Sequence, residues 1–320
     1  MTYYKGPIVD AHHHFWQPSR NKQPWLMPGV DIGFRYGPYE SIKKDYLPPD
    51  LLHDAEGFNL VGTVTMETEW RVDDPVGEML YMQKMKSAYG LPDGSAAHAV
   101  LVDKNVEATL EKLADLPIVK SVRNKPGQSA NYRQAKSTDT LLNNSQWQKG
   151  FKLLRKYSLP FELQVGWWHL DDAGELFNAN PDIPIIINHC ALPSDRSLEA
   201  ISLWKKAVKK IAGLPQVVMK ISGIGLQGVP WTANNNREIV ETLAECFGAD
   251  RIMFASNFPV DSLCGSYKDI FGGFVEITKN WSLSEQRAAF IENAVRIYEL
   301  DKEILNRKSA PNTAFEIKDF

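Results

Sequence analysis

The sequence is poor in cysteine and has no long apolar run, and each lack excludes a class of protein. Three cysteines occur among 320 residues, widely spaced and without a Cys-x-x-Cys pair. This argues against a disulfide framework or a zinc finger and favours a reducing cytoplasm. No apolar run of about 18 residues is present, and "MTYYKGPIVD" lacks the apolar core of a signal peptide. We therefore expect a cytoplasmic protein without a membrane partner.

Net charge and chain length further limit the class of partner and the folds that are expected. A net charge of −3 provides no basic surface for nucleic acid, so a small-molecule substrate is the expected partner. The 320 residues suit one α/β barrel or two smaller domains. The sequence leaves open whether the chain forms a homo-oligomer.

Short β-branched runs alternate with longer segments of helical periodicity along most of the chain. Eight runs are expected to form strands: 7–12, 61–67, 97–103, 118–123, 160–165, 183–189, 216–222 and 251–257. Helical segments between them include 76–89, 105–116, 146–157, 197–213 and 235–248. Because parallel strands need a helical crossover each time, the pattern predicts an α/β fold, a parallel (β/α)₈ TIM barrel. A doubly wound open sheet is the competing fold.

Segments outside this alternation are expected to cover one end of the barrel or to close it. The stretches 15–50 and 126–145 are too long for plain connections and are expected to be flap-like insertions over the C-terminal face. Ser282 and Glu285 form a capping-box pattern that opens a closing amphipathic helix. We expect a single barrel domain over 1–306 and a loose or partner-contacting tail over 307–320.

Three consecutive histidines stand in "DAHHHFW", residues 10–16, in a chain with seven His in all. If "PIVDAHHHF" is a strand, Asp10, His12 and His14 share one face and His13 points the other way. Two imidazoles so spaced can bind one ion or one substrate. The alternative is a polar turn with partly solvated histidines.

Polar or ionisable side chains stand at the C-terminal end of every predicted strand, where barrels of this kind carry their active sites. They are His12, His14, Glu67, Glu69, Asp103, Arg123, Lys125, Gln164, His189, Lys220 and Asn257. An isolated buried polar group costs about 2–7 kcal/mol, so this coincidence predicts that they converge on one site. Taken alone, His189 could be a satisfied buried histidine and Lys220 an exposed strand end.

With these residues assembled, the chain resembles the amidohydrolase superfamily, in particular the amidohydrolase-related branch that holds sugar-lactone and dicarboxylate lactonases. The matching pieces are "DAHHHFW", "INHCALP", "MFASNFPVD" and the closing helix "ENAVRIYEL", and the resemblance runs from about residue 7 to 300. It implies a (β/α)₈ fold and a hydrolase of a cyclic ester or amide. It also implies that His12, His14 and His189 lie in the site.

Three departures from the superfamily bear on metal binding. Arg123 stands where binuclear members carry a Lys or Glu that bridges two ions, Gln164 where many have a His, and Asn257 where Asp is usual. Two metals are therefore not expected. His12, His14 and His189 could hold one Zn²⁺ with an open position, without the customary carboxylate. Some lactonases of this branch work without metal, so both no cofactor and one divalent ion stay open.

Basic and aromatic side chains near the predicted rim indicate the kind of substrate. The planar fork of an arginine suits a carboxylate, so Arg123 and Lys125 are expected to bind an acidic substrate. Trp168 in "GWWHL" offers a flat apolar wall for a sugar or another ring. With Gln164 and Lys220 these form the expected substrate-binding set.

The expected chemistry is attack of water on the carbonyl of a lactone. His12 and His14, with Lys220 or Arg123, or else a bound metal, would polarise the carbonyl oxygen, and His189 is the expected base. The alternatives are a Zn-dependent decarboxylase of a carboxylated muconate-type acid, an amide hydrolase, and a barrel that merely binds a small acid.

Asn257 cannot be the general base, because an amide cannot accept a proton at neutral pH. Asp261 is the other candidate base, and its simpler interpretation is a turn residue after "NFPV". An unperturbed imidazole titrates near pH ~6.5 and a carboxylate near ~4. We therefore expect an acid limb near pH ~6–7 that belongs to His189.

Overall fold

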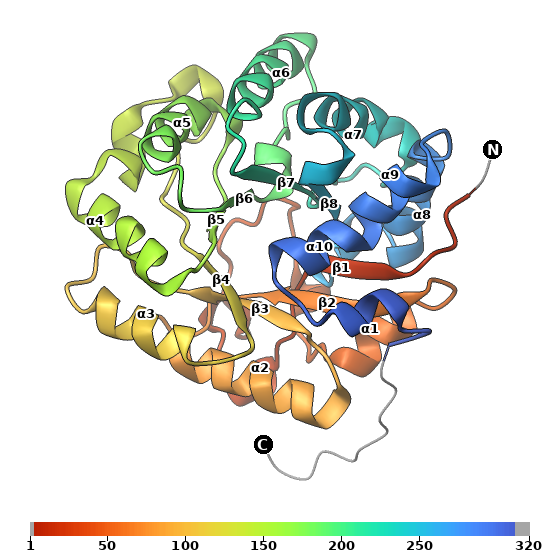
Figure 1. The fold of residues 1–320 in the computed structure, drawn as a ribbon, viewed down its shortest axis with the longest axis horizontal. Coiled ribbons are helices and arrows are strands. Elements are labelled where there is room, and N and C mark those ends of the chain that lie inside the picture. The colour runs from red at the N-terminus through yellow and green to blue at the C-terminus, as the bar shows by residue number, and fades with distance from the viewer. Residues whose placement is uncertain (1–2, 311–320) are drawn as a thin grey trace.

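The computed structural model describes residues 3–310 and shows eight parallel strands around a central axis, with helices outside them (Figure 1). Each strand pairs in parallel with the next along the chain. The strands are β1 (Ile8–His13), β2 (Leu60–Met66), β3 (Gly94–His98), β4 (Val119–Arg123), β5 (Phe161–Leu163), β6 (Ile185–Ile187), β7 (Val217–Ile221) and β8 (Ile252–Phe254). The predicted (β/α)₈ TIM barrel is confirmed.

Helices cover the outside of the barrel between successive strands. They are α1 (Pro48–Asp54), α2 (Pro75–Tyr89), α3 (Val106–Ala114), α4 (Ser145–Leu153), α5 (Leu170–Asn178), α6 (Leu198–Ile211), α7 (Ala233–Phe247), α8 (Tyr267–Ile277), α9 (Leu283–Arg287) and α10 (Asn293–Ile297). A π-helical turn over Ala288–Glu292 joins α9 to α10. The Ser282 capping box is present, because Ser282 Oγ accepts the Glu285 N–H and Glu285 accepts the Ser282 N–H.

Hydrogen bonds from just beyond β8 close the barrel against β1. The Asn257 N–H donates to the carbonyl of His12, and the His14 N–H donates to the carbonyl of Phe258, each at 2.7 Å. Below them, the buried carboxylate of Asp10 accepts the N–H of Ser256 at 3.0 Å and its hydroxyl at 2.5 Å. The first and last strands thus bring His12, His14 and Asn257 together at one seam.

The third strand lies about three residues earlier than expected. Val100–Val102 look like strand by composition, but β3 ends at His98, where its pairing with β4 ends opposite Arg123. The chain then turns against α4, because a Cβ on Gly150 would lie 2.1 Å from the carbonyl oxygen of Leu101. Asp103 is therefore a turn residue that accepts the Asn105 N–H at 2.7 Å, and its expected place at a strand end is wrong.

The stretch 15–50 is a folded flap. Trp16 and Tyr46 form an antiparallel bridge at its base, with backbone bonds of 3.1 and 2.9 Å. Trp25 packs edge-on against Trp16 and stacks on Phe34. The second insertion, 126–145, holds three short 3₁₀ turns. Aromatic packing explains why a Pro- and Gly-rich stretch holds one shape here.

The described part of the predicted tail is attached to the barrel. Arg307 pairs with the buried Asp93 at 2.8 Å, and the N–H of Ala310 donates to the carbonyl of Leu60 at 2.8 Å. The rest of the tail, 311–320, lies outside the described residues. That the chain is one domain over 1–306 stays a prediction.

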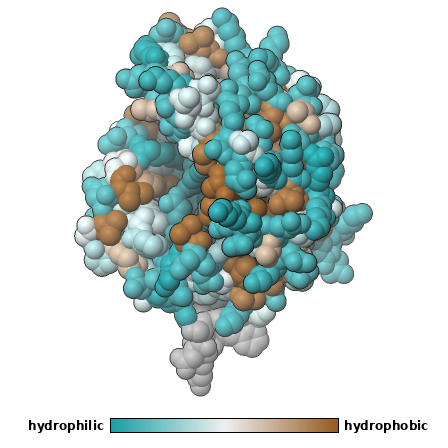
Figure 2. All heavy atoms as spheres, turned by 90° about the vertical axis from the view of Figure 1, so that its left-hand side faces the viewer, coloured by the Kyte–Doolittle hydropathy of each residue, from teal (hydrophilic) through white to brown (hydrophobic). Residues whose placement is uncertain are grey.

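The outer surface over α3, α4 and α5 is mostly hydrophilic, and apolar side chains appear on it in small separate groups (Figure 2). Within residues 3–310, no helix has the length and apolarity needed to cross a bilayer.

Candidate functional site

A cavity of about 220 Å³ opens at the carboxyl ends of the strands. Its wall contains eight of the rim residues expected from the sequence: His14, Glu67, Glu69, Arg123, Lys125, Gln164, His189 and Asn257. The flap of residues 15–50 supplies the remaining side through Trp16, Trp25, Ile32, Gly33, Phe34 and Arg35. Residues far apart in sequence thus converge on one space, as the polar strand ends predict.

The three candidate histidines lie ring to ring beside this cavity. The ring of His12 is 4.4 Å from that of His189 and 5.3 Å from that of His14, centroid to centroid. His13 points to the other side of β1, where its ring packs against Phe15 at 4.3 Å. Strand alternation therefore acts as expected, although His13 is itself fully buried.

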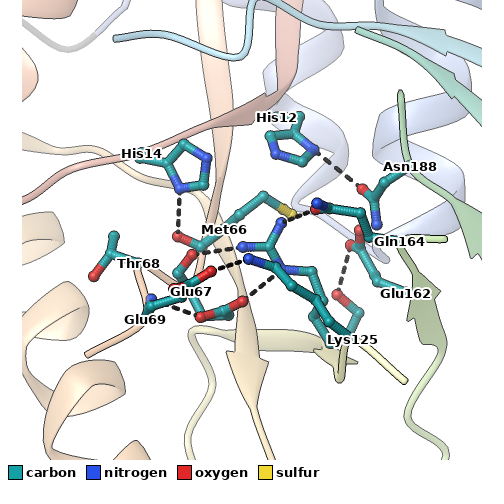
Figure 3. A network of polar contacts seen from close by, with 12 residues as sticks. His12, His14, Met66, Glu67, Thr68, Glu69, Lys125, Glu162, Gln164 and Asn188 are labelled. Atoms are coloured by element: carbon teal, nitrogen blue, oxygen red, sulfur yellow. Dashed lines mark hydrogen bonds and ion pairs between the residues drawn. The ribbon is translucent and has the colours of Figure 1, made fainter. Parts of the chain in front are cut away.

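Each of the three rings is held through its Nδ1 atom, and Figure 3 shows these contacts for His12 and His14. His14 Nδ1 lies 3.3 Å from the carbonyl oxygen of Met66, and His12 Nδ1 lies 3.1 Å from Asn188 Oδ1. His189 Nδ1 lies 2.9 Å from the hydroxyl of Ser222. A carbonyl oxygen only accepts, so a neutral His14 carries its proton on Nδ1 and keeps a lone pair on Nε2.

Burial and nearby cations keep these imidazoles neutral. Burial, followed by Arg35 and Arg123, lowers the pKa of His189 well below its usual value. Burial and Arg123 lower the pKa of His14 to about 3, and burial with the neighbouring His189 lowers that of His12. The neutral His14 ring, which donates from Nδ1 to the Met66 carbonyl, offers Nε2 as an acceptor. That His12 and His14 polarise a carbonyl oxygen stays a prediction.

The backbone after β6 is in an uncommon conformation that presents His189. His189, Cys190, Ala191 and Leu192 all have φ between 54° and 57°. Left-handed backbone costs L-residues roughly 1–2 kcal/mol each, so surrounding contacts must hold this turn. Two such contacts are the Trp204 Nε1–H donating to the Cys190 carbonyl at 2.8 Å and the His189–Ser222 bond.

Gly223 leaves the space in which His189 and Arg35 meet. Its φ is +60°, and a Cβ there would lie 2.4 Å from His189 Nδ1 and 2.7 Å from Arg35 Nη2. Both the backbone conformation and the close approach therefore require a glycine at this position.

The basic residue at the end of β4 is already occupied by protein groups. Arg123 donates from Nε to Glu67 Oε1 at 2.7 Å, from Nη2 to the Glu67 carbonyl at 2.8 Å and from Nη1 to Gln164 at 3.3 Å. Burial opposes ionisation of Glu67, but Arg123 and Lys125 outweigh it and hold the pKa of this carboxyl well below its usual range. Lys125 in turn pairs with Glu69. Arg123 thus contributes positive charge to the cavity, but its guanidinium nitrogens already bond to protein groups and cannot bind a substrate carboxylate in a bidentate way.

Asn257 is oriented by a buried carboxylate and also has left-handed backbone, at φ 57°. Its Nδ2 donates to Asp261 Oδ1 at 2.6 Å, and the hydroxyl of Tyr36 donates to the same oxygen at 3.1 Å. Burial raises the pKa of Asp261 to about 6, although Arg35 opposes the shift. Asp261 is thus a partner of Asn257 and more than a turn residue.

These pKa shifts reverse the expected order of titration. The imidazole of His189 titrates well below pH 6.5, whereas the carboxyl of Asp261 titrates near 6. That an acid limb near pH ~6–7 belongs to His189 stays a prediction, and the directions of these two pKa shifts favour Asp261 as the group that titrates there. Burial shifts the two groups in opposite directions because it disfavours the charged form of each.

Two of the expected substrate-binding residues lie outside this cavity. Lys220 is fully buried inside the barrel and bonds to Glu162 Oε2 at 2.7 Å, and Glu162 also accepts from Tyr298 and Ser121. Trp168 lines a neighbouring cavity. An apolar strand with one lysine looks the same in sequence whether the lysine ends at a rim or pairs inside a barrel.

The site as placed does not fit a divalent metal. The anchored Nδ1 atoms and the unpartnered Nε2 of His12 suit a ligand set. Among residues 3–310, however, no three His, Cys, Asp or Glu side chains are grouped so that they could hold an ion. The nearby cations Arg35, Arg123 and Lys220 also oppose another positive charge at the rings.

Arg35 and Tyr36 are site residues that the sequence did not single out. They lie in a flap without strand or helix periodicity, so no spacing rule places them near a strand end. Asn188 and Ser222 were also missed, although Asn188 directly precedes His189 and Ser222 ends the predicted strand 216–222. A search for polar partners of His12 and His189 at the strand ends could find them.

Comparisons with known proteins agree with this geometry. The model of the family described as amidohydrolase matches residues 9–300. The uncharacterized protein y4mH of Sinorhizobium fredii is 35% identical over 297 residues, which cover 91% of this chain and 98% of that protein. The L-fucono-1,5-lactonase of Burkholderia multivorans is 24% identical over 313 residues, covering 91% of this chain and 96% of that protein. A crystal structure of an amidohydrolase from Burkholderia multivorans with bound Zn aligns with a TM-score of 0.75 at 19% identity, over 92% of this chain and 100% of that chain.

Proposed function

The chain belongs to the amidohydrolase family, and from this membership we propose that it is a hydrolase that opens a small lactone, by attack of water on the ring carbonyl. The observation that carries the proposal is the convergence of His14, His189 and Asn257 on one cavity at the carboxyl ends of the strands. The relatives named L-fucono-1,5-lactonase support a lactone of a sugar acid as the substrate class. A lactone whose ring carries a carboxylate is the other substrate class, because the cavity wall contains the basic residues Arg35, Arg123 and Lys125.

In this proposal His189 moves the proton. Its neutral imidazole lies at the cavity, with Nδ1 on Ser222, so Nε2 accepts a proton from water as the water oxygen bonds to the carbonyl carbon. The ring C–O bond then breaks, and the same proton passes from Nε2 to the leaving alkoxide oxygen. The product is an open hydroxy acid, so every atom of water is accounted for.

The other polar groups position the attacking water and stabilise the negative charge that develops on the carbonyl oxygen. Asn257 orients the water, since one amide N–H is taken by Asp261 and the amide oxygen stays available as an acceptor. Arg123 supplies positive charge for the developing oxyanion, because its guanidinium lines the cavity while Glu67 holds it in place. No step requires a metal, and the donor set around the histidines does not fit one.

A pH-indicator screen tests this function. We expect acid release from at least one lactone in a panel of aldono-1,5-lactones and muconolactone-type acids, with equal rates in the presence and absence of a chelator. Loss of turnover with the chelator, restored by Zn²⁺, would show that the histidines bind a metal. A blank panel together with CO₂ release from a carboxylated muconate would replace hydrolysis by decarboxylation.

The pH profile should report Asp261. We expect kcat/KM to be level above pH about 6 and to fall below it, because protonation of Asp261, whose pKa is raised to about 6, weakens the acceptor that orients Asn257. The sign follows because the ionised carboxylate is the stronger acceptor of the Asn257 N–H. In Asp261→Asn the plateau should be lower and the limb near 6 absent.

Asp10 also has a pKa raised to about 6 by burial, so far-UV circular dichroism across the same pH range serves as the control for folding. A limb that keeps its midpoint in folded Asp261→Asn would assign it to another group.

A further inference from the structure

A second and larger cavity adjoins the first across one arginine. It measures about 640 Å³ and lies over the loops that follow β4, β5, β6 and β7, with Gln128, Trp168, Leu192, Arg196, Ile224 and Val229 among its lining residues. Arg35 lines both cavities, so the outer one begins where the inner one ends.

The two cavities differ in what they can hold. The inner cavity of about 220 Å³ is smaller than the roughly 300–1,000 Å³ common for small-molecule sites, and the outer cavity falls inside that range. A single lactone ring therefore uses the inner cavity and leaves the outer one to water.

Arg35 at the junction differs from the other basic residues of the two walls. Arg123 and Arg196 both donate hydrogen bonds to protein groups, and Lys125 pairs with Glu69. Within the described residues, Arg35 has an ion pair with Asp261 at 3.8 Å and lies over the ring of Tyr36, but its guanidinium forms no hydrogen bond. Its side chain is 32% exposed, so its donors can reach a ligand.

The junction is also close to His189. Arg35 and His189 line the same inner cavity, and Arg35 Nη2 and His189 Nδ1 both lie within 2.7 Å of the position that a Cβ on Gly223 would take. A group attached to a lactone ring in the inner cavity can therefore extend to Arg35 within that cavity.

We propose that the two cavities form one substrate site for a lactone with a second ring. The second ring lies in the outer cavity and carries a carboxylate that binds Arg35, whose planar fork suits that group. This inference rests on the proposed lactonase function, since it assigns the second part of the same substrate.

Matched substrates and variants test the inference. The probes are an aldono-1,5-lactone and the same lactone bearing a uronic acid as its second ring, assayed at pH 8 so that Asp261 stays ionised. We expect wild type to favour the two-ring acid by at least tenfold in kcat/KM. Arg35→Gln and Val229→Trp, which fills the outer cavity, should each reduce this preference about tenfold, mainly through KM.

Two surface variants are the controls. Arg71→Gln changes an exposed arginine paired with Asp73, and Val72→Trp enlarges a side chain that is 65% exposed; neither residue is in the wall of the inner or the outer cavity. Both should keep the wild-type preference. Equal or better turnover of the one-ring lactone by wild type, with no change in Val229→Trp, would overturn the inference and leave the lactonase function intact.

If neither lactone is hydrolysed, the proposed function fails and calorimetry decides the inference separately. The probe is then the open-chain two-ring dicarboxylic acid. Binding to wild type that is lost in both Arg35→Gln and Val229→Trp would support the two-part site, and no binding to wild type would overturn it.

Discussion

Replacing His189 by Gln should lower kcat by roughly 10²–10⁴-fold, the range expected for loss of a proton-transfer group. The side chain lies at the cavity, its Nδ1 is held by Ser222, and its left-handed backbone presents it there. Steady-state kinetics on the best lactone of the panel, with the melting temperature recorded in parallel, would measure this.

His13→Gln is the matched control, because it makes the same substitution at a histidine that does not face the cavity. His13 points away from His12 and packs against Phe15 inside the barrel wall, so we expect an altered melting temperature with kcat within a few fold of wild type. Near-normal turnover by folded His189→Gln alongside inactive Asp261→Asn would transfer the role of base to Asp261.

Replacing Lys220 by Met should cost about 3–5 kcal/mol of unfolding free energy, because Glu162 would remain as a buried charge without its cation. Both side chains are fully buried, and Glu162 Oε2 lies 2.7 Å from Lys220 Nζ. Burial lowers the pKa of Lys220 to about 8 against the opposing effect of Glu162, which is the mark of a costly interior charge. Urea unfolding followed by fluorescence would measure the loss.

The double variant Lys220→Met, Glu162→Gln should recover at least half of that loss, since Gln keeps an oxygen for the hydroxyls of Tyr298 and Ser121. If Lys220 instead binds substrate, as its place near the end of an apolar strand suggests, Lys220→Met would raise KM and leave the unfolding free energy unchanged.

The barrel and most of the residues on its rim can be predicted from the sequence, because they depend on the two-residue alternation of strands and on the helical periodicity of the segments between them. Alternation in "PIVDAHHHF" places His12 and His14 on one face, and the helical segments between strands require parallel pairing, so strand ends such as those carrying His189 and Asn257 must share one end of the barrel. Errors arose where local pattern and tertiary contact disagree. The apolar run at Leu101 continues beyond β3 because it packs against Gly150 of α4, not because it pairs with a neighbouring strand.

The remaining site residues depend on contacts that no spacing encodes. Arg35 reaches the site because aromatic packing folds the flap back over the barrel. Which of His189 and Asp261 titrates near pH 6 depends on burial and on charges contributed by distant segments. A sequence identifies residue types and periodicity, whereas these properties belong to the assembled tertiary structure.

The seam between β8 and β1 joins residues that lie far apart in sequence. His12 and His14 stand at the end of the first strand, whereas Asn257 and the backbone bonds from residues 257 and 258 follow the last strand. A ribosome-bound chain that stops after β7 therefore has its histidines without their amide partner and with an open barrel edge. Such a chain lacks the part of the cavity wall that Asn257 forms, and we expect it to be inactive.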